Sequence, residues 1–115
     1  NPEARARLQR QFTNLLVDEY QDTNRAQFEL VSLLASGTRN VCAVGDDDQA
    51  IYGWRGASVA NIDEFPQHFP LADATPSPVL RLSENRRSGT RILDAANDLA
   101  APLRESGANL VGHLP

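Results

Sequence analysis

The sequence predicts an α/β fold with a mostly parallel sheet. Short apolar runs that end abruptly in polar residues alternate along the chain with longer stretches of helical periodicity. This order of strand, helix, strand, helix, strand and helix is typical of parallel sheets. A polar cluster follows each apolar run, at the strand ends where parallel sheets carry function. With 115 residues, the chain is long enough for one compact domain.

The first strand and helix are expected near the N-terminus. Residues 14–17 form a short apolar run that ends at Asp18 and Glu19, which favours a buried parallel strand. Residues 22–24 supply side chains suited to capping a helix, and a wide apolar helical face follows. Gly37 is the expected end of this helix.

The middle of the chain predicts a second strand, a loop and a helix. Residues 41–44 form a short apolar run, within which Cys42 is expected to be a buried thiol. Residues 45–56 contain too much Gly and Asp for regular structure and are expected to form a loop. Ser58 is expected to cap a helix that Pro66 disturbs or ends.

The last part of the chain predicts a third strand and a third helix. Residues 79–82 are the strand candidate, and a helix is expected to begin at Ser88 or Thr90. Pro102 is expected to end that helix. Residues 104–115 have weak periodicity and are expected to be loose.

Composition limits the possible partners and compartment. The net charge of −4 gives no sign of a polyanion partner, so any nucleic-acid contact must come from a local surface. All eleven basic residues are Arg, which excludes a phosphate-binding loop of the G-x-x-x-x-G-K-[ST] kind within the chain. No apolar run approaches the roughly 20 residues of a membrane helix. We expect a cytoplasmic protein with no membrane association.

The first polar cluster covers residues 18–24. A strand that ends in Asp18 and Glu19 suits metal-assisted nucleotide hydrolysis, because one carboxylate can hold Mg²⁺ through water and the next can polarise the attacking water. The alternative is that both acids only favour the dipole of the following helix. The attached Gln-Asp-Thr-Asn makes the functional interpretation more specific.

The second polar cluster covers residues 44–57. Gln49 can reach a nucleotide phosphate, and Tyr52 and Trp54 offer flat faces on which unpaired bases can stack. The alternative is that both rings fill the core and the acidic run, residues 46–48, is a solvated turn. An exposed Tyr-Gly-Trp-Arg-Gly loop is poor core design, which favours function. The acidic run is expected to be a turn and not a metal site.

The third polar cluster covers residues 82–88. An Arg at a strand end can pair with a phosphate through its planar guanidinium. The alternative is a surface salt bridge, for which Glu84 is the nearest candidate.

Taken together, the three clusters resemble superfamily 1 DNA helicases of the UvrD, PcrA and Rep group. Residues 18–24 are similar to helicase motif II, residues 44–57 to motif III and residues 82–88 to motif IV. The resemblance covers about residues 12–101 and keeps the order of the family's motifs.

The resemblance implies part of a RecA-like P-loop NTPase lobe, truncated before and after. Residues 1–89 would be the rear portion of the first lobe, and residues 90–115 the start of the second lobe or a linker. The P-loop and the later motifs would lie elsewhere in the helicase chain, so the fragment alone is expected to be inactive.

The resemblance also implies ATP and Mg²⁺ as cofactors. Asp18 would coordinate Mg²⁺, and Glu19 would activate the hydrolytic water. Gln49 would sense the γ-phosphate, and Arg87 would stabilise the charge that develops on it. Arg86 departs from the family, which has at this position a Tyr that stacks on adenine; a guanidinium plane can also stack on a base.

The DNA-binding residues implied by the resemblance lie in motif III. Tyr52 and Trp54 would stack on single-stranded DNA, and Arg55 would link the loop to DNA and nucleotide. The implied function is an ATP-dependent DNA helicase and translocase that moves 3′ to 5′ on single-stranded DNA and meets duplex junctions. A degenerate, non-enzymatic remnant that binds DNA or protein is the alternative. A generic P-loop NTPase unrelated to DNA is a third possibility, against which the Tyr-Gly-Trp-Arg-Gly loop argues.

Overall fold

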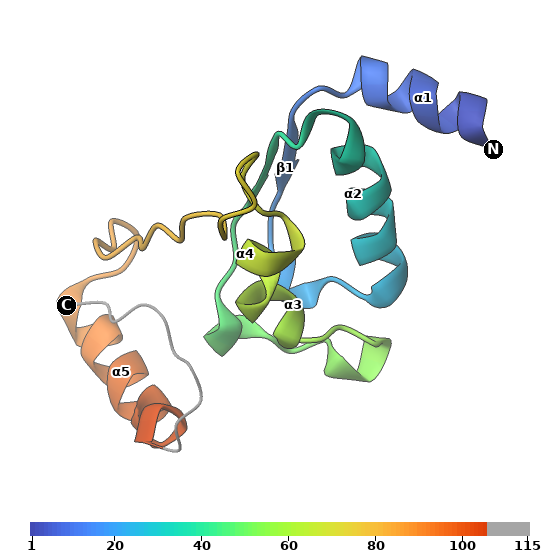
Figure 1. Cartoon of the computed structure of the whole chain (residues 1–115). Helices are drawn as coiled ribbons and strands as arrows, with labels where there is room; N and C mark the ends of the chain where they lie inside the picture. The colour runs from blue at the N-terminus through green and yellow to red at the C-terminus, as the bar shows by residue number, and fades with distance from the viewer. Residues whose placement is uncertain (106–115) are drawn as a thin grey trace. The chain divides into compact units, whose positions relative to one another are not determined.

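The computed structural model describes residues 1–105, and the chain divides into two compact units. The first unit is Asn1–Pro78 and the second begins at Val79. The first unit contains, in chain order, α1 (Pro2–Gln11), β1 (Leu15–Val17), η1 (Tyr20–Asp22), α2 (Arg25–Thr38), β2 (Val41–Ala43), η2 (Asp47–Gln49), η3 (Gly53–Arg55), α3 (Ala60–Asp63) and α4 (Phe65–His68), where η marks a 3₁₀ turn (Figure 1). The second unit contains α5 (Thr90–Glu105).

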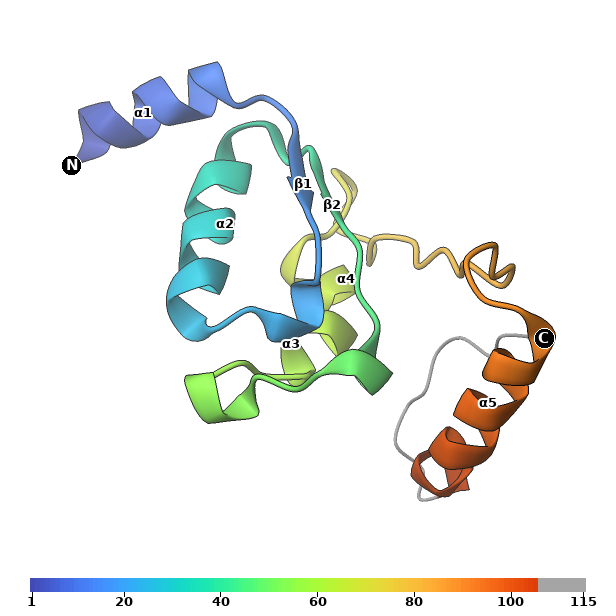
Figure 2. The same ribbon diagram turned by 180° about the vertical axis from the view of Figure 1, so that it is seen from behind.

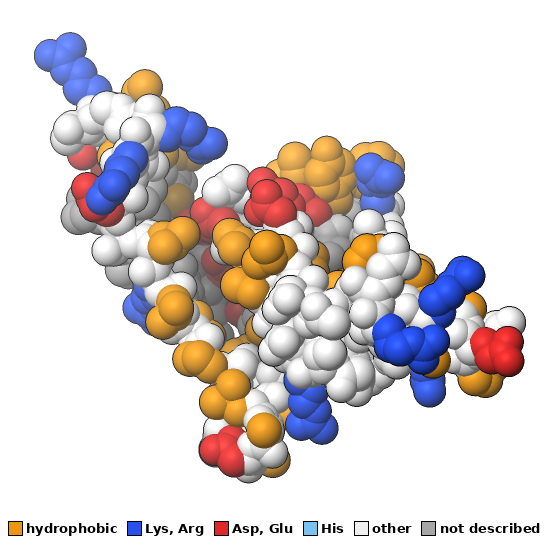
Figure 3. Space-filling model, turned by 90° about the horizontal axis from the view of Figure 1, so that it is seen from above, with side chains coloured by type: hydrophobic (Ala, Val, Ile, Leu, Met, Phe, Trp, Pro, Cys, Tyr) orange, Lys and Arg blue, Asp and Glu red, His pale blue; other side chains and the backbone are white. Residues whose placement is uncertain are grey.

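Strands β1 and β2 pair in parallel, as expected, with Leu16 opposite Cys42. Helix α2 connects them and runs beside both strands in the two opposite views (Figures 1 and 2). The expectation of strands buried on both faces is wrong. Side chains alternate along a strand, so Leu16 and Cys42 share one face; Leu16 is 84% exposed and the Cys42 thiol is exposed, not buried. Hydrophobic side chains are also open to solvent on the face drawn in Figure 3.

Helix α2 begins where the sequence predicts. The Asn24 side chain accepts a hydrogen bond from the Gln27 backbone N–H at 3.0 Å, and the Gln27 side chain accepts one from the Asn24 N–H at 2.9 Å. This reciprocal pair satisfies two backbone donors that the first helical turn leaves without partners. The helix ends at Thr38, and Arg39 follows in a left-handed conformation with φ of 59°.

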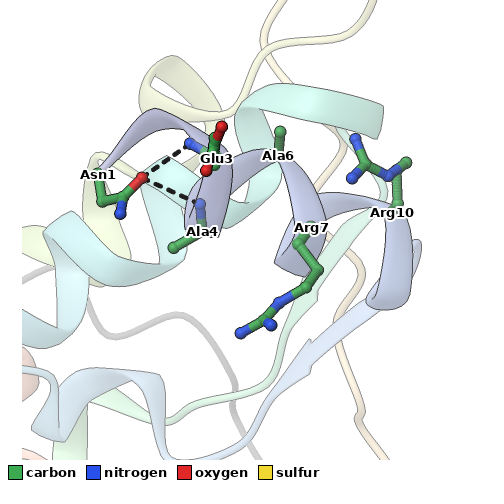
Figure 4. Close-up of a pocket in the computed structure, with 6 residues that line it drawn as sticks. All are labelled: Asn1, Glu3, Ala4, Ala6, Arg7 and Arg10. Carbon is green, nitrogen blue, oxygen red and sulfur yellow. Dashed lines mark hydrogen bonds between the residues drawn. The ribbon is translucent and has the colours of Figure 1, made fainter.

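Gly37 does not end α2, and its role lies in packing. A Cβ at Gly37 would lie 3.2 Å from the Gln9 Cβ, so the missing side chain allows α1 to approach α2. The Gln9 amide then donates hydrogen bonds to the Leu33 carbonyl and the Ser36 hydroxyl. Helix α1 has no counterpart among the elements expected from the sequence; the Asn1 side chain caps it by accepting from two backbone N–H groups (Figure 4).

The core of the first unit is aromatic. Tyr20 is fully buried, and its ring meets the edge of Phe65 with centroids 5.2 Å apart. Phe65 also packs on Phe69, at 4.8 Å. The chain before Phe69 forms two short helices in place of the single expected helix. The expected helix is disturbed near Pro66, as the sequence predicts, because α3 ends at Asp63. Pro66 itself lies in the first turn of α4, where its missing N–H costs no hydrogen bond.

The second unit corrects two further expectations. Residues 79–82 form no strand, and Leu80 and Leu82 are exposed; among the described residues they find no partner strand. Helix α5 begins at Thr90, as expected, but continues past Pro102. A proline inside a helix removes one hydrogen bond to the residue four positions before it, and here that loss does not end the helix. Residues 106–115, most of the stretch expected to be loose, lie outside the described residues. No helix within residues 1–105 is long and apolar enough to cross a membrane.

Candidate functional site

The candidate site lies at the carboxyl end of the two parallel strands. Turn η1 follows β1, and turns η2 and η3 follow β2. All three turns lie at the same end of the first unit in both views (Figures 1 and 2). The first and second polar clusters of the sequence are therefore brought together, although about 20 residues separate them along the chain.

Hydrogen bonds fasten these two clusters to each other. The Tyr20 N–H donates to the Val44 carbonyl at 2.9 Å, which holds the start of the second cluster against the first. Farther along, the Ser58 N–H donates to the Thr23 carbonyl at 3.4 Å. The Asn61 side chain of α3 donates to the same carbonyl at 3.0 Å and to the Thr23 hydroxyl at 3.3 Å. The loop between β2 and α3 is thus held at both ends.

Asp18 and Glu19 occupy a turn of unusual backbone conformation. Glu19 has φ of 50° and ψ of 45°, the left-handed region that non-glycine residues seldom adopt. Such a residue costs about 1–3 kcal/mol, which the surrounding structure must offset. The Asp18 carboxylate accepts a hydrogen bond from the Glu19 N–H at 3.0 Å, and the Glu19 carbonyl accepts one from the Asp22 N–H at 2.9 Å. Both contacts hold the turn.

Gln21 lies in η1, directly after this turn, and only 1% of its surface is exposed. Its amide nitrogen donates to the Glu19 carboxylate at 2.7 Å, and its amide oxygen accepts from the Asp46 N–H at 3.1 Å. The sequence assigns Gln21 to a motif but gives it no role. Only the short distance to Asp46, which lies 25 positions away in the chain, reveals its position between the two clusters.

Asp46 continues the polar connection to Gln49. One oxygen of the Asp46 carboxylate accepts from the Asp48 N–H at 3.1 Å, which caps turn η2. The other oxygen accepts from the Gln49 amide at 2.7 Å. A continuous series of hydrogen bonds therefore runs from the Glu19 carboxylate through Gln21 and Asp46 to the Gln49 side chain.

Negative charge is concentrated in turn η2. Burial raises the pKa of Asp47, and the neighbouring carboxylates of Asp48, Asp63 and Asp46 raise it further, while a hydrogen bond to the backbone lowers it. Within residues 1–105, no group of three or more His, Cys, Asp or Glu side chains is placed to hold a metal ion.

Turn η3 presents an aromatic surface. Trp54 is 79% exposed and Tyr52 is 36% exposed, so neither ring fills the core. Their ring centroids lie 6.1 Å apart. The Arg55 guanidinium carbon lies 5.4 Å from the Tyr52 ring centre and 5.7 Å from that of Trp54. An arginine against two aromatic rings is a favourable arrangement of cation and π faces, and it places three groups able to stack on bases in one turn.

Arg86 and Arg87 belong to the second unit. The Arg86 guanidinium forms an ion pair with the Glu84 carboxylate at 2.8 Å, and both side chains are exposed. The backbone N–H groups of Arg87 and Ser88 both donate to the Asn85 side chain, at 2.9 and 2.8 Å. The expected surface salt bridge is therefore present at Arg86, and Asn85 shapes the turn that carries Arg87.

Parallel strands, an Asp-Glu turn and an exposed aromatic loop at one sheet end define a candidate nucleotide and nucleic-acid site, and comparison with known proteins gives the class. Residues 1–70 match the family model of the UvrD/REP helicase N-terminal domain. The chain therefore belongs to the UvrD/REP helicase family.

Individual relatives are similar over most of this chain. It is 54% identical to DNA helicase II of Escherichia coli (strain K12) over 88 residues, which make up 76% of this chain and 12% of that protein. It is 49% identical to the ATP-dependent DNA helicase PcrA of Staphylococcus aureus (strain Mu50) over 98 residues, or 85% of this chain and 13% of that protein. The chain thus spans about one eighth of the length of these relatives.

Proposed function

We propose that the chain is part of an ATP-dependent DNA helicase and carries its motifs II, III and IV. Residues 18–24, 44–57 and 82–88 would be these motifs. The proposal is supported by the family of the chain and by relatives named as DNA helicases, one of them ATP-dependent. The parallel arrangement of β1 and β2, with α2 between them, is compatible with a RecA-like lobe. Residues 1–89 would belong to the first lobe and residues 90–115 to the start of the second lobe or a linker.

The residues proposed to act on ATP are Asp18, Glu19 and Gln49 in the first unit and Arg86 and Arg87 in the second unit. Asp18 would hold Mg²⁺, which neutralises phosphate charge when it is bound with ATP. One carboxylate suits this ion, because Mg²⁺ takes one or two carboxylates with phosphates and water; the contact from the Glu19 N–H already orients the Asp18 side chain. Glu19 would accept the proton of the attacking water. Gln49 would contact the γ-phosphate, Arg87 would stabilise its developing charge, and Arg86 would stack on adenine.

The part of the proposed site that would bind DNA is residues 52–55, called the aromatic turn below. Tyr52 and Trp54 would stack on unpaired bases, and Arg55 would link this loop to DNA and nucleotide. Base stacking on aromatic side chains tolerates any sequence, as a translocating protein requires. Single-stranded DNA and duplex junctions would be the substrates, and movement would run 3′ to 5′. The remainder of the helicase chain would complete the site.

One observation carries this proposal above all others. The loop formed by residues 45–57 is hydrogen-bonded to the Glu19 turn at one end and presents the exposed Trp54 at the other. A change at the phosphate end can therefore shift the position of the stacking rings, which is the coupling that a DNA motor needs.

The proposed role of Glu19 predicts the effect of Glu19→Gln in the full-length helicase. The amide has nearly the shape of the carboxylate but cannot accept the proton of the attacking water. General base catalysis contributes about 10²–10⁴-fold to such reactions, so DNA-stimulated ATP hydrolysis should fall by at least about 100-fold. Affinity for a single-stranded oligonucleotide should stay unchanged. Phosphate release and fluorescence anisotropy measure the two effects.

Glu29→Gln is the matched control. Glu29 makes an exposed ion pair with Arg25 on α2, and such pairs contribute at most about 1 kcal/mol to stability. The control should keep wild-type turnover. Wild-type turnover in Glu19→Gln itself would reject the proposed role, and a wild-type helicase without DNA-stimulated hydrolysis would favour the non-enzymatic alternative.

A further inference from the structure

Gln21 is a buried amide whose two ends are both engaged. Its nitrogen donates to the Glu19 carboxylate at 2.7 Å and its oxygen accepts from the Asp46 N–H at 3.1 Å. With 1% of its surface exposed, the side chain has little access to water. A buried amide that lost either contact would leave a polar group unsatisfied, which is costly.

The chemistry of the partners fixes the orientation of this amide. A carboxylate only accepts hydrogen bonds and a backbone N–H only donates them. The Gln21 nitrogen must therefore face Glu19 and the oxygen must face Asp46. A rotated amide would place its oxygen against the Glu19 carboxylate and its NH₂ group against the Asp46 N–H.

Packing holds the Gln21 side chain in place. A Cβ at Gly45 would lie 2.7 Å from the Gln21 amide oxygen and 2.7 Å from the Ile62 Cδ1, so the backbone at Gly45 approaches the amide closely. Glu19, by contrast, is an exposed residue in a left-handed turn, and its long side chain has several rotamers available. The contact from Gln21 selects among those rotamers.

We infer that Gln21 is a positioning residue that orients the Glu19 carboxylate and ties it to the Gln49 loop. The inference rests on the proposed function of Glu19 and Gln49. Asp46 completes the connection, since its N–H donates to Gln21 and its carboxylate accepts from Gln49 at 2.7 Å. A displacement of Gln49, as when phosphate leaves, is thereby transmitted to the group that activates water.

Gln21→Met in the full-length helicase tests this inference. Methionine keeps the length and approximate volume of glutamine and removes both hydrogen bonds. Because the Glu19 carboxylate remains and loses only the contact that orients it, kcat of DNA-stimulated ATP hydrolysis should fall about tenfold, a part of the full effect of a general base. KM for ATP and Kd for a single-stranded oligonucleotide should stay within about twofold, since the Gln21 side chain is buried and offers almost no surface to either ligand.

Two further variants separate positioning from general structural damage. Gln67→Met, the same change at an exposed position of α4, should behave as wild type. Gln21→Glu, assayed at alkaline pH where both carboxylates are ionised, can accept from the Asp46 N–H but cannot donate to Glu19. It should lose at least as much kcat as Gln21→Met and decides the question if the methionine variant does not fold.

A double-mutant cycle gives the sharpest readout. In the Glu19→Gln background the group that Gln21 orients is already disabled, so adding Gln21→Met should not lower the residual turnover further. A purely structural role would lower it again by the same factor. Additive losses, or wild-type kcat in Gln21→Met or in Gln21→Glu, would overturn the inference.

The outcome also separates this inference from the proposed function. If Glu19→Gln is inactive and Gln21→Met has wild-type kcat, only the role of Gln21 is rejected. If Glu19→Gln itself keeps wild-type turnover, the proposed function of the site fails, and the role of Gln21 fails with it.

Discussion

Arg55, Tyr52 and Trp54 form a preassembled stacking surface on turn η3. The guanidinium lies 5.4 and 5.7 Å from the two ring centres. At an exposed site each such contact is worth about 0.5–1 kcal/mol. That energy favours one arrangement of the two rings. If the rings stack on DNA bases as proposed, less conformational entropy would be lost on binding.

Trp54→Ala should therefore weaken binding of single-stranded DNA by the full-length helicase. Stacking on an aromatic side chain contributes about 1–3 kcal/mol per base, which corresponds to a Kd increase of roughly 5- to 150-fold. Trp54→Phe keeps a flat ring and should recover most of the affinity. Anisotropy titration with a labelled oligonucleotide measures both.

Phe12→Ala is the matched control for Trp54→Ala. Phe12 is also an exposed aromatic residue of the first unit, but it lies outside the aromatic turn. Its replacement should leave DNA affinity unchanged. Equal weakening by both variants, or no weakening by Trp54→Ala, would contradict the proposed stacking role.

For single residues, the sequence predicts the chemistry of a side chain better than it predicts the contacts of that side chain in the folded protein. Residue type and spacing are enough to place Asp18, Glu19 and Gln49 among the candidate residues, because the chemistry of a carboxylate or an amide does not depend on the fold. The role of Gln21 is not predictable in the same way. Its partner Asp46 lies 25 positions away, and only the folded chain brings the two together.

Among the elements, the join between β2 and η2 depends on one glycine. At Gly45 the backbone passes so close to Gln21 and Ile62 that a Cβ would lie 2.7 Å from an atom of each. The neighbours on that side are a buried amide held by two hydrogen bonds and an apolar side chain of α3. The Gln21 oxygen cannot move away without weakening its hydrogen bond from the Asp46 N–H. The close approach of the two clusters therefore favours glycine at this position.

Gly45→Ala should destabilise the full-length protein by about 1–3 kcal/mol, the usual cost of an overpacked interior. Urea denaturation followed by circular dichroism measures the change, provided that the domain carrying this chain unfolds in a resolved transition. Gly53→Ala is the control, because nothing lies within 4 Å of a Cβ at Gly53. It should change stability by less than about 0.5 kcal/mol. Equal effects of the two substitutions would show that Gly45 is not constrained by packing.

The elements themselves are partly predictable. Strands β1 and β2 and the start of α2 follow from local signals: apolar runs with polar ends, and a capping box at Asn24. The predictions fail where contacts with a distant segment determine the local structure. Gly37 stays helical because it packs on Gln9 of α1, and residues 79–82 form no strand because a strand needs a partner to pair with. Likewise, the exposure of Cys42 depends on which segments cover that face of the sheet.

For the whole molecule, the proposed function divides the site between this chain and the rest of a larger helicase. The chain spans 12–13% of the length of its relatives and carries no lysine. It supplies a turn suited to activating water and a loop suited to stacking on bases. The groups that cradle a triphosphate in P-loop proteins are a glycine-rich loop and its lysine. Under the proposed function, another part of the protein would supply them.

The 115-residue chain alone is therefore expected not to hydrolyse ATP. Without a P-loop lysine, the β- and γ-phosphates lose their principal cationic ligand and the nucleotide is not held against Glu19. Phosphate release would be measured with Mg²⁺, ATP and single-stranded DNA for the purified chain and for its Glu19→Gln variant. Both should give the same background rate. Hydrolysis that depends on Mg²⁺ and exceeds that of the variant would mean that the chain binds the triphosphate by groups of its own. The arginines of residues 81–91 would then be the first to test, because they lie within or directly beside the proposed motif IV.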